Sequence, residues 1–384
     1  MRITLGNSSL VSYQQGGGHW SWFLQYPLGL RALGHDVFWL ELMQSTGERG
    51  HDMQLVRDFF ARLAIYNLDK NCALLLFNEK LDFQPFDKCE AFGRDQRDVR
   101  EIIRSTDLLL NFCSAVRQPL LSMFNYRALL DFDPGHLQVS ALMCNLNIHD
   151  HHVCMTLGWR INVSGSEVPK LGIRWRTFDP CIYLPMWRAA GDPGVHAPFT
   201  SITQWTWEEL PWNGGLVSVS KRAAYLKYRE IPRLAGRPFE LAANIGNDDP
   251  AGDRDHMREG GWHLAEPHDV VGTPAQYQEY IRASRAEFMC PKPIHLVMRT
   301  GWFSDRSIAY LASGRPVLAE DTGFSERLPT GAGLVAFRNA EEALAGIAEI
   351  DGNYERHRRA ARDLAESVFD SRKCLTEMLS ACGA

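Results

Sequence analysis

The stretch that decides the fold is Arg299–Leu328, which reads RTGWFSDRSIAYLASGRPVLAEDTGFSERL. Its middle part predicts a helix, because apolar residues recur there at helical spacing. These residues are Ile308, Ala309, Leu311 and Ala312. Ser304 precedes them, and serine is a residue type that caps a helix N-terminus by accepting a hydrogen bond from a free amide. The stretch therefore predicts a loop, then a helix that begins near Ser304.

A strand follows this helix closely. Gly314 is typical of a helix C-terminus, and Pro316 prevents the helix from continuing. The apolar run 317–319 then predicts a short buried strand, and the loop 321–324 follows its carboxyl end. The order loop, helix, turn, strand and loop is typical of an α/β sheet.

This layout brings a helix N-terminus near a strand-end loop, where free amides and the helix dipole attract anions. Arg299 and Arg306 add positive charge, and Gly323 allows the backbone to approach a ligand closely. A diphosphate fits such a place. The alternative is an ordinary helix–strand unit in which Ser304 is a cap and nothing more, and the residues alone leave both interpretations open.

The run Ala312–Val317, together with Gly323 and Glu326, resembles the carboxyl-terminal half of GT-B glycosyltransferases, which bind the nucleotide sugar there. Two positions that are acidic in the retaining members are Gly301 and Ala309 here. The resemblance implies an α/β fold in which two Rossmann-like, doubly wound domains face a cleft. It also implies a set of donor-binding and diphosphate-binding residues: Arg299, Gly301, Trp302, Ser304, Asp305, Arg306, Thr322, Gly323, Phe324, Glu326 and Lys221.

A second group of candidate residues lies near the amino terminus. The run Gly16-Gly17-Gly18 allows a close turn with free amides, and His19 follows in the first loop of the expected sheet. A neutral imidazole there accepts a proton from an acceptor hydroxyl, unless His19 only caps or packs the loop. The resemblance extends to this segment, because inverting GT-B enzymes carry a histidine in this loop and a Gly-His pair 15 residues later, here Gly34-His35.

Asp133 is the second catalytic candidate. It belongs to an Asp131-Phe132-Asp133 run, a pattern that holds a divalent metal in another class of glycosyltransferase. Two carboxylates at a strand end are also common without a metal, and Asp133-Pro134 is typical of a turn. We expect no metal and no cofactor, because amides and arginines can neutralise the diphosphate of the co-substrate. Asp133 would line the acceptor side.

Length favours two domains, since 384 residues exceed one ordinary domain. Prolines and glycines concentrate over residues 177–198, which predicts the boundary. We expect an acceptor-side domain over 1–196, a nucleotide-sugar domain over 197–352, and a terminal segment over 353–384. That segment predicts one long basic helix, Tyr354–Cys382, which would pack back on the first domain.

Composition restricts the partners and the compartment. A net charge of −5 argues against a nucleic-acid binder that relies on bulk charge, and nine cysteines without a Cys-x-x-Cys pair are typical of reduced thiols. Met1–Leu5 leads directly into a strand, and no apolar run is long enough to span a membrane. We expect a cytoplasmic protein without a transmembrane segment. The oligomeric state stays open, a homodimer included.

The resulting hypothesis is a hexosyltransferase that moves a sugar from a UDP-sugar or TDP-sugar to an acceptor hydroxyl on a small molecule, glycan or natural product. Two alternatives remain: a nucleotide-sugar epimerase on the same fold, and a nucleotide-sugar-binding protein that has lost catalysis. The sequence leaves the sugar, the base, the acceptor and the stereochemical outcome undetermined.

Overall fold

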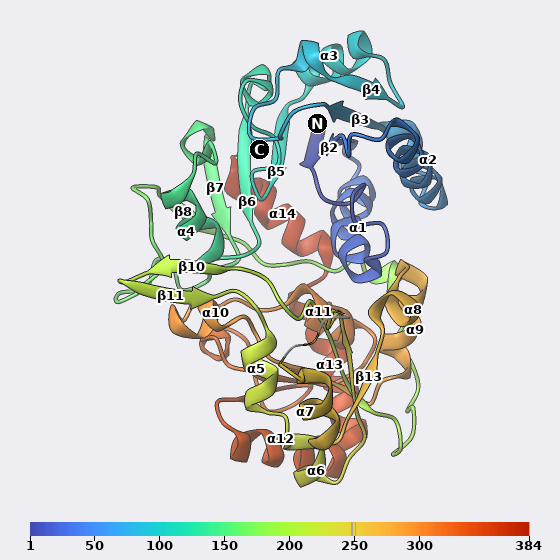
Figure 1. The fold of residues 1–384 in the computed structure, drawn as a ribbon, viewed down its shortest axis with the longest axis vertical. Helices are drawn as coiled ribbons and strands as arrows, with labels where there is room; N and C mark the ends of the chain where they lie inside the picture. Colours follow the sequence, from blue (N-terminus) through green and yellow to red (C-terminus); the bar gives the residue numbers. More distant parts are fainter. Residues whose placement is uncertain (247–248, 250, 384) are drawn as a thin grey trace.

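The computed structural model describes residues 1–246, 249 and 251–383, and it contains two sheets, one in each half of the chain (Figure 1). The first sheet has the order β4-β3-β2-β1-β5-β6-β7-β8 and is parallel except for β4. Its central strands are buried along their whole length, as expected for a parallel sheet with helices on its faces. The strands are β1 (Arg2–Asn7), β2 (Asp36–Gln44), β3 (Cys72–Phe77), β4 (Glu90–Phe92), β5 (Leu108–Phe112), β6 (Arg127–Asp131), β7 (Val153–Thr156) and β8 (Trp175–Thr177).

Four α-helices accompany this sheet. Helix α1 begins at Gly17, so Gly17, Gly18 and His19, which we expected in a loop, form its first turn. The segment 118–124 forms only the short 3-10 turn Leu120–Met123. The helices are α1 (Gly17–Ala32), α2 (Arg49–Ile65), α3 (Gln96–Ser105) and α4 (His136–Met143).

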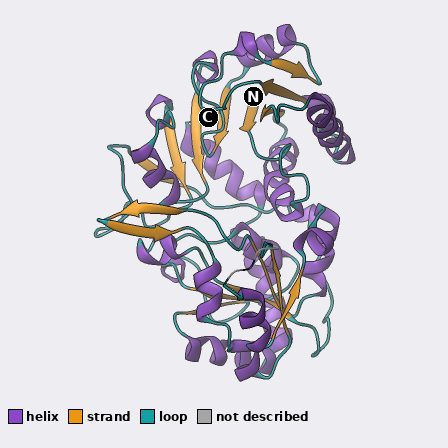
Figure 2. Cartoon of the chain, viewed as in Figure 1, coloured by secondary structure: helices purple, strands orange, loops and turns teal. Residues whose placement is uncertain are grey.

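The second sheet is parallel and has the order β13-β12-β9-β14-β15-β16. Its strands are β9 (Phe199–Thr203), β12 (Phe239–Ala243), β13 (Trp262–Ala265), β14 (Ala286–Met289), β15 (Val317–Glu320) and β16 (Leu334–Phe337). An antiparallel hairpin, β10 (Glu209–Trp212) and β11 (Gly215–Ser218), stands apart from this sheet and reaches toward the first domain in Figure 2. The helices of this half are α5 (Arg222–Lys227), α6 (Ile231–Ala235), α7 (Asp253–Glu259), α8 (Pro267–Val271), α9 (Pro274–Ala283), α10 (Pro293–Val297), α11 (Asp305–Ala312) and α12 (Ala340–Gly352).

The stretch that opened the sequence analysis has the predicted structure. Ser304 caps α11, because its hydroxyl accepts a hydrogen bond from the backbone amide of Arg306 at 3.2 Å. Gly314 has φ +68°, which allows the chain to turn sharply after α11. All four residues of β15 are buried. The helix N-terminus therefore faces the same side as the carboxyl ends of the neighbouring strands.

The terminal segment differs from the single helix that we expected. It breaks after Phe369 into α13 (Tyr354–Val368) and α14 (Ser371–Cys382), because Asp370 caps a new helix. Helix α13 packs on α11, whereas α14 packs on α1 in the first half of the chain. The contact is close, since a Cβ on Gly29 would lie 2.5 Å from Leu375. The chain thus begins and ends in the same domain (Figure 1).

No helix in the described part of the chain is both long and apolar enough to cross a bilayer.

Candidate active site

A cavity of about 750 Å³ lies between the two domains, at the carboxyl ends of strands from both sheets. Ligands in open α/β sheets bind at such strand ends. The cavity brings together ten of the sequence-predicted site residues. They are Gly16, Gly17, Gly18, His19, Asp133, Lys221, Trp302, Ser304, Asp305 and Arg306.

Two of the three glycines, Gly17 and Gly18, are required by a close contact between α1 and α9. A Cβ on Gly17 would lie 2.2 Å from the carbonyl oxygen of Thr273, and one on Gly18 would lie 2.8 Å from the ring of Tyr277. None of the three glycines has a positive φ, so the backbone is not strained there. The glycines instead allow the first turn of α1 to approach α9, and this approach closes one side of the cavity.

His19 lies on the first turn of α1 and is half-buried, and its ring packs against aromatic side chains. Its Nε2 lies 2.8 Å from the hydroxyl of Ser9, and its ring stacks on Trp22 at 5.7 Å with an interplanar angle of 12°. Burial lowers the pKa of His19 to about 4. The imidazole is therefore neutral near pH 7 and has a nitrogen lone pair that can accept a proton.

Asp133 lines the same cavity as His19 and is held by cationic and imidazole groups. Its carboxylate contacts the ammonium of Lys292. The same carboxylate lies 3.0 Å from Nδ1 of His136 and 3.3 Å from Nε2 of His295. Burial alone would raise the pKa of Asp133, yet these three neighbours hold it well below its usual range. Its neighbour Asp131 points elsewhere, since Gln138 and Thr156 donate to it at 2.7 Å.

The cluster around Asp133 joins the two domains. Lys292 and His295 belong to the second domain, and Nε2 of His136 reaches Glu208 of that domain at 2.9 Å. No group of three or more His, Cys, Asp or Glu side chains in the described residues has an arrangement suited to a metal ion.

The N-terminus of α11 forms another part of the cavity wall. Arg306 on its first turn donates from Nε to Oε1 of Glu287 at 2.6 Å, and Glu287 is fully buried. Nη2 of Arg306 and Oε2 of Glu287 have no hydrogen-bond partner among the described residues. The cap residue Ser304 and Asp305 line the same wall, and burial raises the pKa of Asp305. The first turn thus presents an incompletely paired guanidinium beside the positive end of a helix dipole.

Lys221 adds a second cation to this wall. Its side chain is only 9% exposed, and its Nζ lies 5.8 Å from the ring centroid of Trp302. Burial, with the nearby charges of Arg306 and Lys292, lowers the pKa of Lys221 to about 7. Trp302 is fixed in place, because it stacks on His295 at 4.4 Å and donates to the carbonyl of Phe132 at 3.0 Å. Three cationic side chains therefore surround one end of the cavity.

Six predicted donor residues do not line the cavity: Arg299, Gly301, Thr322, Gly323, Phe324 and Glu326. The loop after β15 packs behind Trp302, because the hydroxyl of Thr322 donates to the Trp302 carbonyl at 2.6 Å and the amide of Gly301 donates to the Thr322 carbonyl at 3.0 Å. Glu326 is paired with Arg299 and with Arg160 of the first domain. Ser304 is thus at the cavity, whereas Gly323 is not, and a donor role for these six residues stays a prediction.

Several cavity residues escaped the sequence analysis. Lys292 follows β14 at its carboxyl end, which is a usable signal, because strand ends of this kind carry ligand-binding groups. Tyr277 belongs to α9 and Trp22 to α1. Their place in the cavity depends on how α1 meets α9, which no local pattern specifies.

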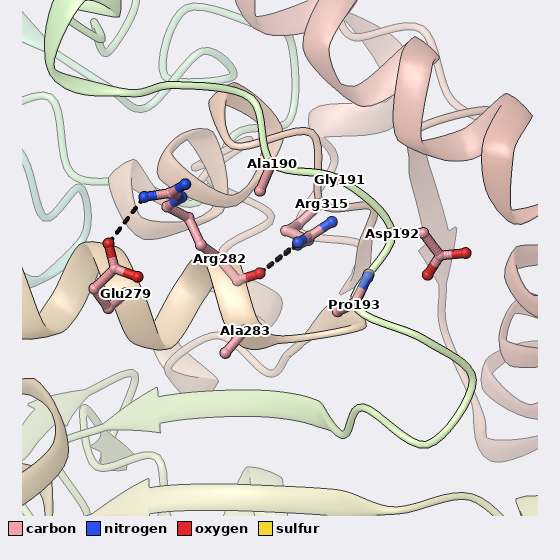
Figure 3. A pocket seen from close by; sticks show the side chains of 8 residues that line it. All are labelled: Ala190, Gly191, Asp192, Pro193, Glu279, Arg282, Ala283 and Arg315. Atoms are coloured by element: carbon pink, nitrogen blue, oxygen red, sulfur yellow. Dashed lines mark hydrogen bonds and ion pairs between the residues drawn. The ribbon is translucent and has the colours of Figure 1, made fainter.

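A second hollow, of about 410 Å³, lies where the chain passes from the first domain to the second (Figure 3). It is found at the amino ends of β14 and β15, opposite the carboxyl ends that form the cavity. Its most buried side chain, Arg315, is 1% exposed and donates to the carbonyl of Arg282, as the dashed line in Figure 3 marks. Asp192 pairs with Arg285 at 2.9 Å, which anchors the connecting segment. The side-chain contacts around this hollow have a structural role, because they hold the connecting segment in place.

Comparison with known proteins gives matches in structure only. No family model matches the sequence, and no curated protein matches it. An alpha-glucosyltransferase solved with UDP and DNA superposes with a TM-score of 0.62 at 12% identity, over 100% of both chains. HepE of Anabaena, solved with UDP and glucose, gives 0.57 at 14% identity, over 99% of this chain and 100% of that one. Sucrose-phosphate synthase of Thermosynechococcus elongatus gives 0.53 at 11% identity, over 99% and 98%.

These superpositions cover both domains and their relative placement, so they establish the fold. The chain has the GT-B fold, with two Rossmann-like domains that face a cleft. The expectation for the fold class is confirmed.

Proposed function

We propose that this protein is a glycosyltransferase of the hexosyltransferase type, which moves a sugar from a nucleotide-diphosphate sugar to an acceptor hydroxyl. One observation carries the proposal. Lys221, Lys292 and Arg306 lie near one another in the cavity beside the N-terminus of α11, and a neutral histidine, His19, lines the same cavity. The fold supports it, because two structures that share this fold contain UDP, one of them together with glucose.

The cations would act where negative charge develops. When the bond between the sugar and the diphosphate breaks, the diphosphate keeps the electron pair, and preorganised positive groups stabilise it. Lys221 and Arg306 are already desolvated, so their attraction for a bound anion is stronger than it would be in water. Three cations and a helix dipole supply the charge that a metal supplies elsewhere, so we propose that the reaction needs no metal and no cofactor.

His19 would act on the acceptor. Its neutral imidazole takes the proton of the acceptor hydroxyl while the hydroxyl oxygen bonds to the anomeric carbon of the sugar. Closure of the two domains would exclude water, which would otherwise hydrolyse the donor. Asp133 has a lowered pKa and several partners, which makes it a weak base, so we assign it the role of a charged group that pairs Lys292.

The proposal is tested first by binding and then by turnover. Thermal unfolding is measured with UDP, TDP, UDP-glucose and uridine, in the presence of EDTA. Stabilisation by the diphosphates and little effect of uridine are expected, since binding to the native state raises the unfolding midpoint. Turnover is then followed as nucleotide diphosphate release with a panel of hydroxyl acceptors. An epimerised sugar without acceptor would point to an epimerase, and binding without turnover would point to a binding protein.

A further inference from the structure

The ring nitrogens of His19 differ in their surroundings. Nε2 lies 2.8 Å from the hydroxyl of Ser9, whereas Nδ1 has no hydrogen-bond partner among the residues that the structure describes. A neutral imidazole carries its proton on one nitrogen and its basic lone pair on the other, and the hydrogen bond of one nitrogen decides which is which. The partners of Ser9 therefore determine where His19 can accept a proton.

The hydrogen-bond partners of Ser9 connect it to the buried carboxylate of Glu41. Ser9 donates to Oδ1 of Asn7 at 3.3 Å, and Nδ2 of Asn7 donates to Oε2 of Glu41 at 3.3 Å. Asn7 and Glu41 are paired in register across the neighbouring strands β1 and β2, and both are buried. The four residues form one continuous chain of hydrogen bonds from the interior of the first domain to the cavity.

Glu41 determines which group donates and which accepts in each hydrogen bond of this series. Four N–H groups point at its carboxylate, since Oε1 accepts from the amides of Leu10 and Val11 at 2.9 and 3.1 Å, and Oε2 accepts from Nε1 of Trp39 at 2.9 Å as well as from Asn7. Burial raises the pKa of Glu41 to about 7, and above this pH the ionised carboxylate is only an acceptor, so the Asn7 side chain turns its NH₂ group toward Glu41. Its carbonyl oxygen then faces Ser9.

The orientation of the Asn7 side chain in turn determines the tautomer of His19. The hydroxyl of Ser9 has one proton, and it gives that proton to Asn7. Ser9 must then accept from His19, so Nε2 carries the ring proton. The opposite arrangement, with Ser9 donating to Nε2, would leave Oδ1 of buried Asn7 without a donor, which is unfavourable.

We infer that Glu41, Asn7 and Ser9 are positioning residues that hold His19 as the Nε2–H tautomer and leave Nδ1 as the nitrogen that takes a proton. For its catalytic consequence this inference rests on the proposed function. The proton passes from the acceptor hydroxyl to Nδ1, the oxygen uses its electron pair to bond the anomeric carbon, and the diphosphate leaves with the pair of the broken bond. The tautomer itself is a property of the protein alone.

The experiment measures the tautomer by ¹⁵N NMR of the full chain labelled at histidine. The His19 signals are assigned by their loss in His19→Gln. Above about pH 8, where Glu41 is ionised, the wild type should show a protonated Nε2 and an unprotonated Nδ1. Ser9→Ala should give a mixture of tautomers, whereas Ser9→Thr keeps the hydroxyl and should restore the wild-type pattern. Ser8→Ala is the matched control, because the hydroxyl of this neighbour has no hydrogen-bond partner in the described part of the chain.

A protonated Nδ1 in the wild type overturns the inference, and so does a Ser9→Ala spectrum equal to that of the wild type. The spectrum of the wild type decides this even where a variant does not fold. Turnover provides the second readout: Ser9→Ala should lower kcat by about 10- to 100-fold with an unchanged Kd for UDP, since general-base catalysis contributes at least this much. Should the expected tautomer be found in a protein without transferase activity, the proposed function fails and the hydrogen-bond chain stands.

Discussion

Asp133 of the first domain and Lys292 of the second are in direct contact across the cleft, and both line its cavity. Without a ligand, the carboxylate of Asp133 thus neutralises one of the three cations that would bind a diphosphate. Nε2 of His295, which also belongs to the second domain, lies 3.3 Å from the same carboxylate, so Asp133 also connects the two halves of the molecule.

Asp133→Asn should therefore strengthen the binding of UDP. Lys292 would lose the carboxylate that competes with the diphosphate, and we expect a gain of roughly fivefold, or about 1 kcal/mol. Isothermal titration calorimetry measures it at low ionic strength. Lys292→Met is the counterpart and should weaken binding. Weaker binding of UDP by Asp133→Asn would contradict the competition between carboxylate and ligand.

Arg306→Ala should weaken the binding of UDP more than that of uridine, because the guanidinium faces the diphosphate end of the cavity. It should also lower the free energy of unfolding by about 3–5 kcal/mol, since Glu287 would stay buried and unpaired. Arg306→Ala with Glu287→Gln should recover much of this stability but not the affinity. Arg338→Ala is the control, as this arginine is 66% exposed, pairs with Asp321 and does not line the cavity. Equal losses for UDP and uridine would argue against the diphosphate assignment.

The affinity for UDP should fall as the pH rises above about 7. The pKa of Lys221 is lowered to about 7, so the ammonium loses its charge above this pH and no longer attracts the diphosphate. Lys221→Arg should remove the decline between pH 7 and 9, because a guanidinium stays charged there. Calorimetry from pH 6 to 9 checks both proteins. A decline of the same size in Lys221→Arg would assign it to another group.

His19→Ala should leave the Kd for UDP within about twofold and lower turnover by roughly 10²- to 10⁴-fold, the usual contribution of a general base. Because the pKa of His19 is about 4, its imidazole is neutral over pH 5–7 and protonates only below this range. The activity of the wild type should thus be insensitive to His19 down to about pH 5 and decline near pH 4. Unchanged turnover in His19→Ala would reduce His19 to a packing residue.

Gly17→Ala should destabilise the protein by about 1–3 kcal/mol, which is typical of overpacking. Its Cβ would lie 2.2 Å from the Thr273 carbonyl oxygen and would push α1 away from α9. Gly50→Ala in α2 is the matched control, because a Cβ there would meet nothing within 4 Å. This control should be stabilised by about 0.5–1 kcal/mol, as alanine favours a helix over glycine. Chemical denaturation measures both. Equal effects would contradict the close helix contact.

Local patterns in the sequence predicted the elements that depend on neighbouring residues. The cap at Ser304, the helix after it, the turn at Gly314 and the buried strand β15 all follow from spacing and residue type within a few positions. The same reasoning placed His19 in the loop after the first strand, at the end where parallel sheets bind ligands. Hence the fold class and part of the cavity were predictable.

The contacts between segments that are distant in the sequence could not be predicted from local patterns. The break of the terminal helix at Asp370 depends on how α14 meets α1, and the loop after β15 turns to Arg160 instead of the cavity. The pairing of Asp133 with Lys292, and the path from Glu41 to His19, join residues that are far apart in the chain or on different strands. Such contacts arise from the packing of whole domains, where a shift of one helix changes which side chains meet. Periodicity and turn signals report only the local backbone, so the tertiary structure alone decided which of the candidate groups face one another.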